Sequence, residues 1–155
     1  MGGVKPLLGG KYTLGQSLGS GGMGAVFEAN DPHGHVVAVK TLFVGPGAWA
    51  TTAETRARFE REVDATRRLA HRNVVALLDS GVDDATGAPY LLMPRMRGED
   101  LGQLLARVKV LEPSVAIPIV IQACRGVSAG HAAGIVHRDL KPSNLFLEQE
   151  DGSSS

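Results

Sequence analysis

The segment from His137 to Asn144 carries the side chains most able to do chemistry. Asp139 offers a carboxylate that can orient and deprotonate a hydroxyl group. Lys141 offers a cation for the charge that develops on a phosphate, and Asn144 offers an amide oxygen for a metal ion. At this chain's residue frequencies, His, Arg, Asp, Lys, Pro and Asn fall at these positions by chance less than about once in a million. The segment therefore offers groups that could act on a hydroxyl, a phosphate and a metal ion.

Three glycines, Gly19, Gly21 and Gly24, have the spacing G-x-G-x-x-G and are followed by Val26. Glycine there lets the backbone approach phosphate oxygens closely. The spacing alone is weak evidence, because the chain holds 20 glycines among 155 residues and a flexible hairpin turn explains it about equally well. A dinucleotide-binding fold would need this turn to open a helix. Residues 25–30 leave no room for a helix and return as a strand, which excludes that fold.

A lone charge, Lys40, ends an otherwise apolar strand segment. Such a lysine can protect a sheet edge from aggregation, or it can aim an ammonium group at nucleotide phosphates. The second role needs a carboxylate, and Glu62 is preferred because it lies beside Val63 on the expected inward face of the next helix. Glu60 is the alternative partner. A solvated helix face of mixed charge is the third interpretation.

Strand patterns surround these motifs. Between residues 11 and 43 the apolar residues predict three antiparallel strands, with Asp31–Gly34 as the turn between the second and third. Two further strands are predicted at Val74–Leu78 and Tyr90–Met93, separated by a polar turn-forming segment at 79–89. Together they predict a five-stranded antiparallel sheet.

Helical patterns fill the rest of the chain. A helix is predicted from Thr51, whose partner in a capping box would be Glu54, to about residue 70, with Phe59 and Val63 on its inward face. Two more helices are predicted at about 100–108 and 115–133. In the second of these, Pro118 belongs in the first turn or marks a later start. From Glu148 onward the tail is expected to be an exposed loop or a frayed end.

The composition favours a folded domain that is not specialised for charged surfaces. The length of 155 residues and the 43% hydrophobic content are enough for one core, and 16 basic residues balance 16 acidic ones. Neither nucleic acid nor an anionic membrane is therefore an expected partner. We expect no signal peptide in Met1–Gly10 and no apolar segment of the roughly 20 residues that cross a bilayer. The single cysteine, Cys124, suits a reducing compartment, and a cytoplasmic location is expected.

The motifs occur in an order that resembles the eukaryotic-like serine/threonine protein kinases of bacteria, and the resemblance runs from about Tyr12 to Leu147. It implies an α+β, protein kinase-like fold with a five-stranded antiparallel N-terminal lobe, one helix and a truncated helical C-terminal lobe. The implied boundaries are a flexible N-terminus at 1–10 and an incomplete kinase domain at 11–155, divided into an N-lobe at about 11–93, a hinge at about 94–99 and a partial C-lobe at about 100–155.

The resemblance also implies the cofactors and the roles of the site residues. ATP and Mg²⁺ (or Mn²⁺) would be bound, and the acceptor would be a serine or threonine of a protein substrate. Lys40, paired to Glu62, would contact the α- and β-phosphates. Asp139 would act as catalytic base, Lys141 would contact the γ-phosphate and Asn144 would bind metal. The implied ATP-binding residues are Leu18, Gly19, Ser20, Gly21, Gly22, Met23, Gly24, Val26, Ala38, Lys40, Met93, Pro94, Met96 and Phe146.

The adenine site follows from the same resemblance. Met93 would be the gatekeeper, the Pro94 carbonyl and the Met96 amide would bind the base, and Val26, Ala38 and Phe146 would clamp the ring. Relatives often have an acidic residue where Pro94 stands. Proline is tolerable there because the position contributes only its carbonyl.

The resemblance fails at one point, since no Asp-Phe-Gly follows Leu147 and the family's principal metal-binding aspartate is absent. The helix at 115–133 should also be partly exposed at Ile117, Ile119, Val120, Ile121 and Val127. We expect a fragment of a serine/threonine kinase that is by itself weakly active or inactive. The alternative is a non-catalytic module that binds nucleotide or another protein.

Overall fold

The computed structural model describes residues 7–21, 24–42 and 53–149. The chain divides into two compact units. The first comprises residues 1–68 and 75–95, and we call it the sheet unit. The second comprises residues 69–74 and 96–155, and we call it the helical unit.

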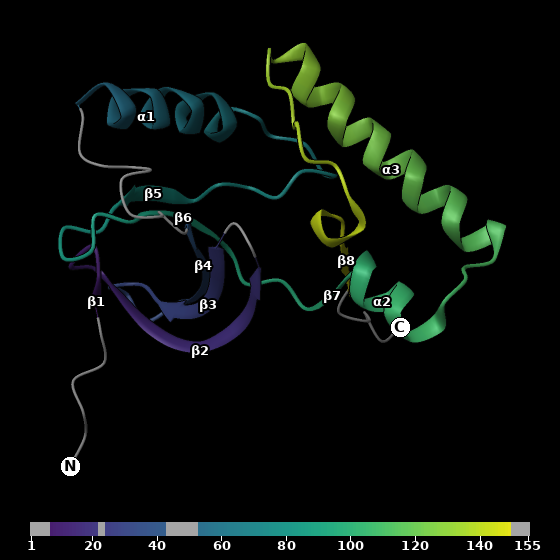
Figure 1. Cartoon of the computed structure of the whole chain (residues 1–155), viewed down its shortest axis with the longest axis horizontal. Coiled ribbons are helices and arrows are strands. Elements are labelled where there is room, and N and C mark those ends of the chain that lie inside the picture. Colours follow the sequence, from purple (N-terminus) through teal and green to yellow (C-terminus); the bar gives the residue numbers. More distant parts are fainter. Residues whose placement is uncertain (1–6, 22–23, 43–52, 150–155) are drawn as a thin grey trace. The chain divides into compact units, whose positions relative to one another are not determined.

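Among its described residues, the sheet unit contains one helix and a curled antiparallel sheet in the order β1-β2-β3-β4-β6-β5 (Figure 1). The sheet has six strands, not the predicted five, because Leu7 and Leu8 pair with Thr13 and Tyr12 and form an additional edge strand. Leu8 is buried in the core, which favours the pairing of this segment with β2. The elements are β1 (Leu7–Leu8), β2 (Tyr12–Gly21), β3 (Gly24–Asn30), β4 (Val36–Leu42), α1 (Ala53–Arg67), β5 (Asp79–Val82) and β6 (Pro89–Pro94).

The prediction of a strand at Val74–Leu78 is wrong, because the edge strand that pairs with β6 is β5, at Asp79–Val82. The apolar residues before it misled the prediction: Val75 and Leu78 are exposed. β5 is an edge strand of polar and small residues, so its sequence lacks the apolar alternation of a half-buried strand. The polar turn is correspondingly shorter than predicted and is held by Asp83, whose carboxylate accepts hydrogen bonds from Thr86.

The predicted hairpin between β3 and β4 is confirmed. Asp31 directly follows β3, and its carboxylate accepts hydrogen bonds from the backbone N–H groups of His33 and His35, both at 2.8 Å. Tyr90–Met93 is likewise confirmed as a strand within β6. The hairpin matters for function because it sets the register between β3 and β4, which runs without a shift from Gly24↔Leu42 to Asn30↔Val36.

One face of the sheet carries the core. Tyr12 and Tyr90 meet edge to face there, with ring centroids 5.9 Å apart. Val39, on the interior strand β4, is fully buried. The residues packed on this face are Leu8, Tyr12, Leu14, Ala29, Val37, Val39, Tyr90 and Leu92.

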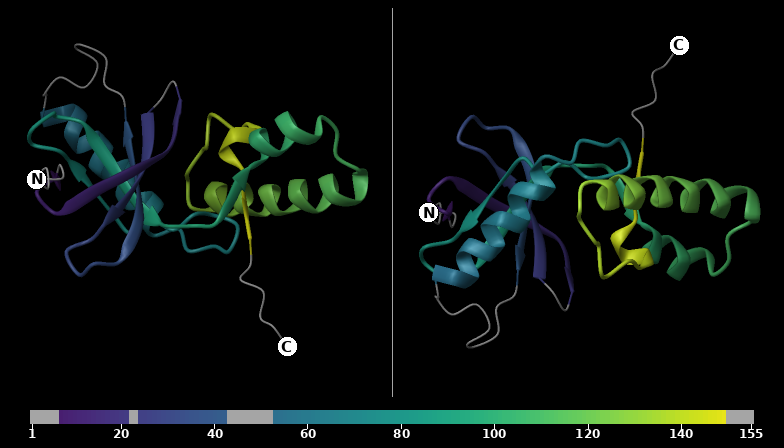
Figure 2. Two further views of the ribbon diagram at one scale, coloured as in Figure 1. Left: turned by 90° about the horizontal axis from the view of Figure 1, so that it is seen from below. Right: turned by 90° about the horizontal axis from the view of Figure 1, so that it is seen from above.

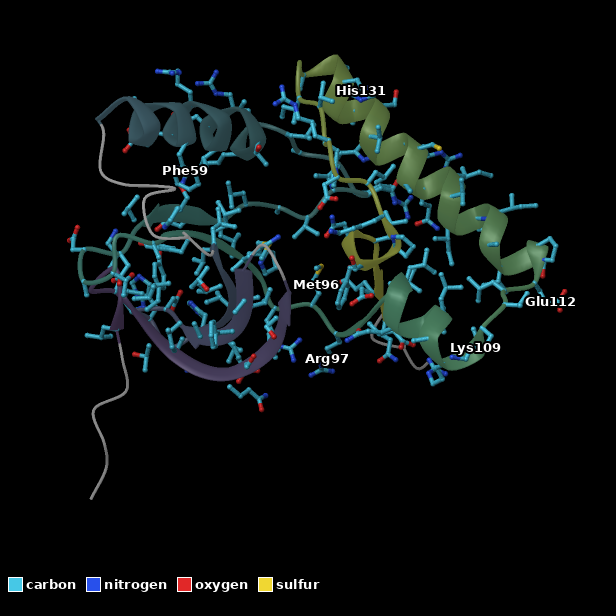
Figure 3. The ribbon with its side chains drawn as sticks, in the orientation of Figure 1. Phe59, Met96, Arg97, Lys109, Glu112 and His131 are labelled. Atoms are coloured by element: carbon cyan, nitrogen blue, oxygen red, sulfur yellow. The ribbon has the colours of Figure 1, made fainter. Side chains whose placement is uncertain are left out.

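Helix α1 presents Phe59 and Val63 inward as predicted, and both side chains are buried (Figure 3). The proposed capping residue Thr51 lies outside the described residues. The helix ends at Arg67, earlier than the predicted residue 70. Arg67 places its guanidinium 3.3 Å from the Asp79 carboxylate, which ties the end of α1 to β5.

The helical unit contains two helices that run alongside each other in both views of Figure 2, and a two-stranded sheet. Asp100 caps the shorter helix with Gln103 in a reciprocal capping box. Pro118 lies inside the longer helix, which begins earlier than predicted, at Pro113. The elements are β7 (Gly98–Asp100), α2 (Leu101–Val108), α3 (Pro113–Ala132), the 3₁₀ turn η1 (Pro142–Asn144) and β8 (Phe146–Glu148). Glu148, expected in a loop, pairs with Gly98 instead.

Helix α3 packs on the segment 69–74. A Cβ on Gly126 would lie 2.5 Å from the Asn73 carbonyl oxygen, so only glycine allows this close approach. The opposite part of α3 is exposed as predicted: Ile117, Val120 and Ile121 are exposed, while Ile119 and Val127 are partly buried. Within the described part of the chain, no helix has both the length and the apolar character needed to cross a membrane.

Gly24 is required by the sheet itself. Its φ is 155°, and a Cβ there would lie 2.0 Å from the Thr41 carbonyl oxygen. Gly24→Ala is therefore expected to lower the free energy of unfolding by about 2 kcal/mol, measured by urea denaturation. Gly19→Ala is the control, because no heavy atom lies within 4 Å of its added Cβ. Equal losses of stability for the two variants would contradict this account.

Candidate active site

Four of the predicted ATP-binding residues share one face of the sheet. Residues directly opposite each other on neighbouring strands point to the same side. Val26 is opposite Lys40, and Ala38 is opposite Met93. Because Ala38 and Lys40 are two positions apart on β4, all four side chains lie on one face, the reverse of the core face. We call it the Lys40 face, and its members are Val26, Glu28, Ala38, Lys40, Leu91 and Met93.

The glycine motif forms the hairpin from β2 to β3. Gly21 pairs with Gly24 at its tip, and the predicted residues Gly22 and Met23 lie outside the described residues. Leu18 is half-buried on β2, and Gly19 and Ser20 after it are exposed. The fold requires glycine at Gly24, but it leaves open space around Gly19.

Lys40 is half-buried on β4. Its preferred partner, Glu62, lies on α1 next to the buried Val63, but the side chain of Glu62 is outside the described part of the structure. The Lys40–Glu62 ion pair therefore stays a prediction. Glu60, the alternative partner, has an exposed side chain.

The catalytic loop brings together the three residues that the sequence singled out. The Lys141 ammonium lies 3.0 Å from Asp139 Oδ2. Asn144 Nδ2 donates to the Asp139 backbone oxygen at 2.7 Å and to Asp139 Oδ2 at 3.2 Å. The Asp139 N–H donates to His137 Nδ1 at 3.3 Å, which orients the start of the loop. One carboxylate oxygen, Asp139 Oδ2, is thus held by a cation and an amide.

Local structure fixes this geometry. Residues Pro142–Asn144 form a 3₁₀ turn closed by the Asn144 N–H and the Lys141 carbonyl oxygen at 2.9 Å. The N-terminus of α2 supports the turn, since the Leu101 N–H donates to the Leu145 carbonyl oxygen at 2.8 Å. Arg138 has a φ of 61°, a left-handed conformation that is costly for a residue with a side chain. Such strain just before Asp139 is typical of a functional loop.

The hydrogen bond from Lys141 and the charge of this residue hold the pKa of Asp139 below its usual value, and Asn144 adds to the effect. Lowering the folded-state pKa favours the carboxylate, so the associated stability is present at neutral pH and is lost as the pH falls through that pKa. The ionised carboxylate can accept a hydrogen bond from a hydroxyl group.

We predict that Lys141→Met will raise the pKa of Asp139 toward the ordinary aspartate value. Carboxyl-carbon NMR of selectively labelled protein, titrated from neutral pH downward, measures the midpoint. Arg125→Met, a change of charge on α3 with no contact to the loop in the described structure, serves as control. An unchanged midpoint in Lys141→Met would show that the ion pair does not form in solution.

The oxygen atoms at the loop suit a hard metal cation as ligands. Both hydrogen bonds of Asn144 use its amide nitrogen, so the amide oxygen is the atom available to a metal. Mg²⁺ commonly takes few protein ligands and completes its shell with water and phosphate oxygens, which an amide oxygen and a nearby carboxylate can support. Among the described residues, no group of three His, Cys, Asp or Glu side chains gathers in a way that could hold a metal by itself.

The remaining adenine residues are divided between the units. Pro94 is the last residue of β6 and lies opposite Val37. Met96 belongs to the helical unit and precedes β7 (Figure 3). Phe146, on β8, pairs with Asp100 on β7. Phe146 is 39% exposed, so the fold does not bury it as a core residue.

Two features escaped the sequence patterns. Arg95 Nε donates to Glu28 Oε2 at 3.3 Å, and the only sequence signal was that each residue stands two positions after a member of the Lys40 face. The helical unit also has an apolar cavity of about 340 Å³ on α3, which Asp139, Lys141 and Asn144 do not line. Its lining residues are Val120, Ala123, Cys124, Val127, Ser128, His131, Leu140 and Leu145.

A sheet face with a lone lysine, a glycine hairpin and an Asp–Lys–Asn loop are features that protein kinases share. Residues 12–153 match the family model described as the protein kinase domain, and the chain belongs to the protein kinase family.

Similar proteins agree with this assignment. The chain is 40% identical over 145 residues to the probable serine/threonine-protein kinase PknB of Corynebacterium glutamicum, covering 92% of this chain and 22% of that protein. It is 38% identical over 143 residues to the serine/threonine-protein kinase PknD of Mycobacterium tuberculosis, covering 92% and 21%. A double mutant of the Mycobacterium tuberculosis PknI kinase domain superposes with a TM-score of 0.81 at 28% identity, covering 97% of this chain and 60% of that one. The chain thus spans about a fifth of the length of these curated relatives.

Proposed function

We propose that the chain supplies the ATP-binding and catalytic-loop residues of a serine/threonine protein kinase, which transfers the γ-phosphate of ATP to serine or threonine hydroxyls of proteins. The observation that carries the proposal is the arrangement of Asp139, Lys141 and Asn144 within hydrogen-bonding distance in one loop. The names of the relatives support the choice of serine and threonine as acceptors.

Each residue has a physical task in this proposal. Asp139 orients the acceptor hydroxyl and takes its proton, and its lowered pKa keeps it ionised and able to accept the hydrogen bond of that hydroxyl. Lys141 stabilises charge that develops on the transferred phosphate once it leaves its ion pair with Asp139. Lys40 holds the α- and β-phosphates, and the exposed backbone at Gly19 approaches the phosphates.

Mg²⁺ would be held by Asn144 and would neutralise phosphate charge when bound. The chain contains no Asp-Phe-Gly, so the carboxylate that bridges metal and phosphates in this family is not among these residues. We therefore propose that the 155-residue chain alone transfers phosphate weakly, while a complete kinase domain built on it is active. The proposed use of ATP as a substrate also favours the cytoplasm as the place where this protein acts.

A chimera tests the proposal. Residues 1–149 would be joined to the corresponding remainder of the Corynebacterium glutamicum PknB kinase domain, and transfer of radiolabelled phosphate from ATP to a generic protein substrate would be followed with and without Mg²⁺. Mg²⁺-dependent transfer is the expected result. A folded chimera that binds ATP and transfers nothing would favour a non-catalytic nucleotide-binding module instead.

A further inference from the structure

An ion pair joins the end of β6 to the middle of β3. Arg95 Nε lies 3.3 Å from Glu28 Oε2, and the two side chains are 33% and 31% exposed. The two residues are 67 positions apart in the sequence. β4 lies between β3 and β6 in the sheet, so the pair reaches across it.

The pair lies on the Lys40 face. Glu28 is directly opposite Ala38, and Ala38 is directly opposite Met93, so their side chains share this face. Arg95 stands two residues after Met93, and its contact with Glu28 places its guanidinium on the same side. The ion pair is therefore next to the side chains proposed to enclose adenine, away from the core.

The backbone explains why a side-chain connection matters at this point. Pro94 is the last residue of β6 and lies opposite Val37, so the backbone pairing between β4 and β6 ends here. The chain beyond Pro94, which leads toward the residues proposed to bind adenine, has no further partner in this ladder. The Arg95–Glu28 pair supplies a connection there, and it reaches the strand that carries Val26.

We infer that Glu28 and Arg95 are positioning residues for an adenine nucleoside. They fix the distance between Val26 on β3 and Met93–Pro94 on β6, the two walls that would hold the base. The inference rests on the proposed function and deepens it, because it assigns control of base affinity to two residues outside the motifs. Neither residue is required to touch the nucleotide.

The position of the pair predicts which part of the ligand will sense its loss. A change in the walls of the base site alters the affinity for adenosine and for ATP by the same factor. Loss of the Lys40 charge alters the affinity for ATP but not for adenosine, because adenosine has no phosphates. This contrast separates positioning of the base from binding of the phosphates.

The experiment measures dissociation constants of ATP and of adenosine for the 155-residue chain by isothermal titration calorimetry. Glu28→Gln and Arg95→Gln are each expected to weaken both ligands by roughly twofold to fivefold, the range of a half-exposed ion pair. The charge-reversed double variant, Glu28→Arg with Arg95→Glu, is expected to restore both affinities. In about 1 M salt the differences should shrink, because the Debye length falls to about 3 Å.

Arg67→Gln is the matched control. It breaks an ion pair of the same length, 3.3 Å, and similar exposure, between α1 and Asp79. Asp79 lies opposite the core-face residue Leu92, so this pair is not on the Lys40 face. Arg67→Gln is expected to leave the affinity for adenosine unchanged even where thermal unfolding shows lower stability.

The outcomes distinguish the inference from the function on which it rests. A wild-type chain that is folded by circular dichroism and binds no ATP overturns the proposed function and the inference with it. A wild-type chain that binds ATP, with Glu28→Gln and Arg95→Gln variants of unchanged affinity, overturns the inference alone. Failure of the double variant to recover would show that the single changes acted separately, which also contradicts the inference.

Discussion

Asp139→Asn is expected to lower the rate of phosphoryl transfer by the chimeric kinase domain by about 10²- to 10⁴-fold, the contribution typical of a positioned general base. Asparagine keeps the size of the side chain and can still meet the Lys141 ammonium through its amide oxygen. It cannot accept the proton of the acceptor hydroxyl. The initial rate of transfer at saturating ATP and Mg²⁺ measures the effect.

Two comparisons make this first result interpretable. The dissociation constant for ATP should change little in Asp139→Asn, because the residue is proposed to act on the acceptor hydroxyl. Ser143→Ala alters an exposed residue of the same 3₁₀ turn and should retain most of the activity. A rate for Asp139→Asn within tenfold of the wild-type rate would remove Asp139 from the role of base.

Lys40→Met is the second change with a large expected effect, a loss of about 10- to 100-fold in ATP affinity. That range corresponds to one hydrogen bond to a charged group, at about 1.5–3 kcal/mol. Methionine keeps the length and apolar stem of the lysine and removes only the charge. Fluorescence titration of the 155-residue chain with a labelled ATP analogue measures the change, and competition with unlabelled ATP gives its affinity.

Adenosine serves as the internal control for Lys40→Met, since its affinity should not change. A loss of affinity for ATP and adenosine alike would mean that the substitution damaged the fold of the Lys40 face. Equal ATP affinity in variant and wild type would show that Lys40 does not hold the phosphates, and its place on the interior strand β4 leaves no edge for it to protect.

The proximity of the three candidate catalytic residues was predictable because it is local. Asp139, Lys141 and Asn144 lie within six residues, so a short turn suffices to bring them together. The placement of Val26, Ala38 and Lys40 was also accessible, because alternation along two strands joined by a recognisable turn fixes which side chains share a face.

What the sequence could not give depends on contacts between distant segments. The apolar pattern of Val74–Leu78 resembles that of a real strand. Only the pairing with β6 shows that the edge strand lies further along the chain, at Asp79–Val82. Leu7 and Leu8 become a strand because Leu8 reaches a core that includes residues far along the chain, such as Tyr90 and Leu92. The Arg95–Glu28 pair likewise follows from the sheet order, which no local pattern contains.

Identification of the phosphorylated amino acid in the product of the chimera tests the central claim most directly. Labelled protein substrate would be hydrolysed in acid and its phosphoamino acids separated, in parallel with the Asp139→Asn product. The account predicts phosphoserine or phosphothreonine from the wild-type chimera and almost none from the variant. Phosphotyrosine as the main product, or equal labelling by the variant, would contradict it.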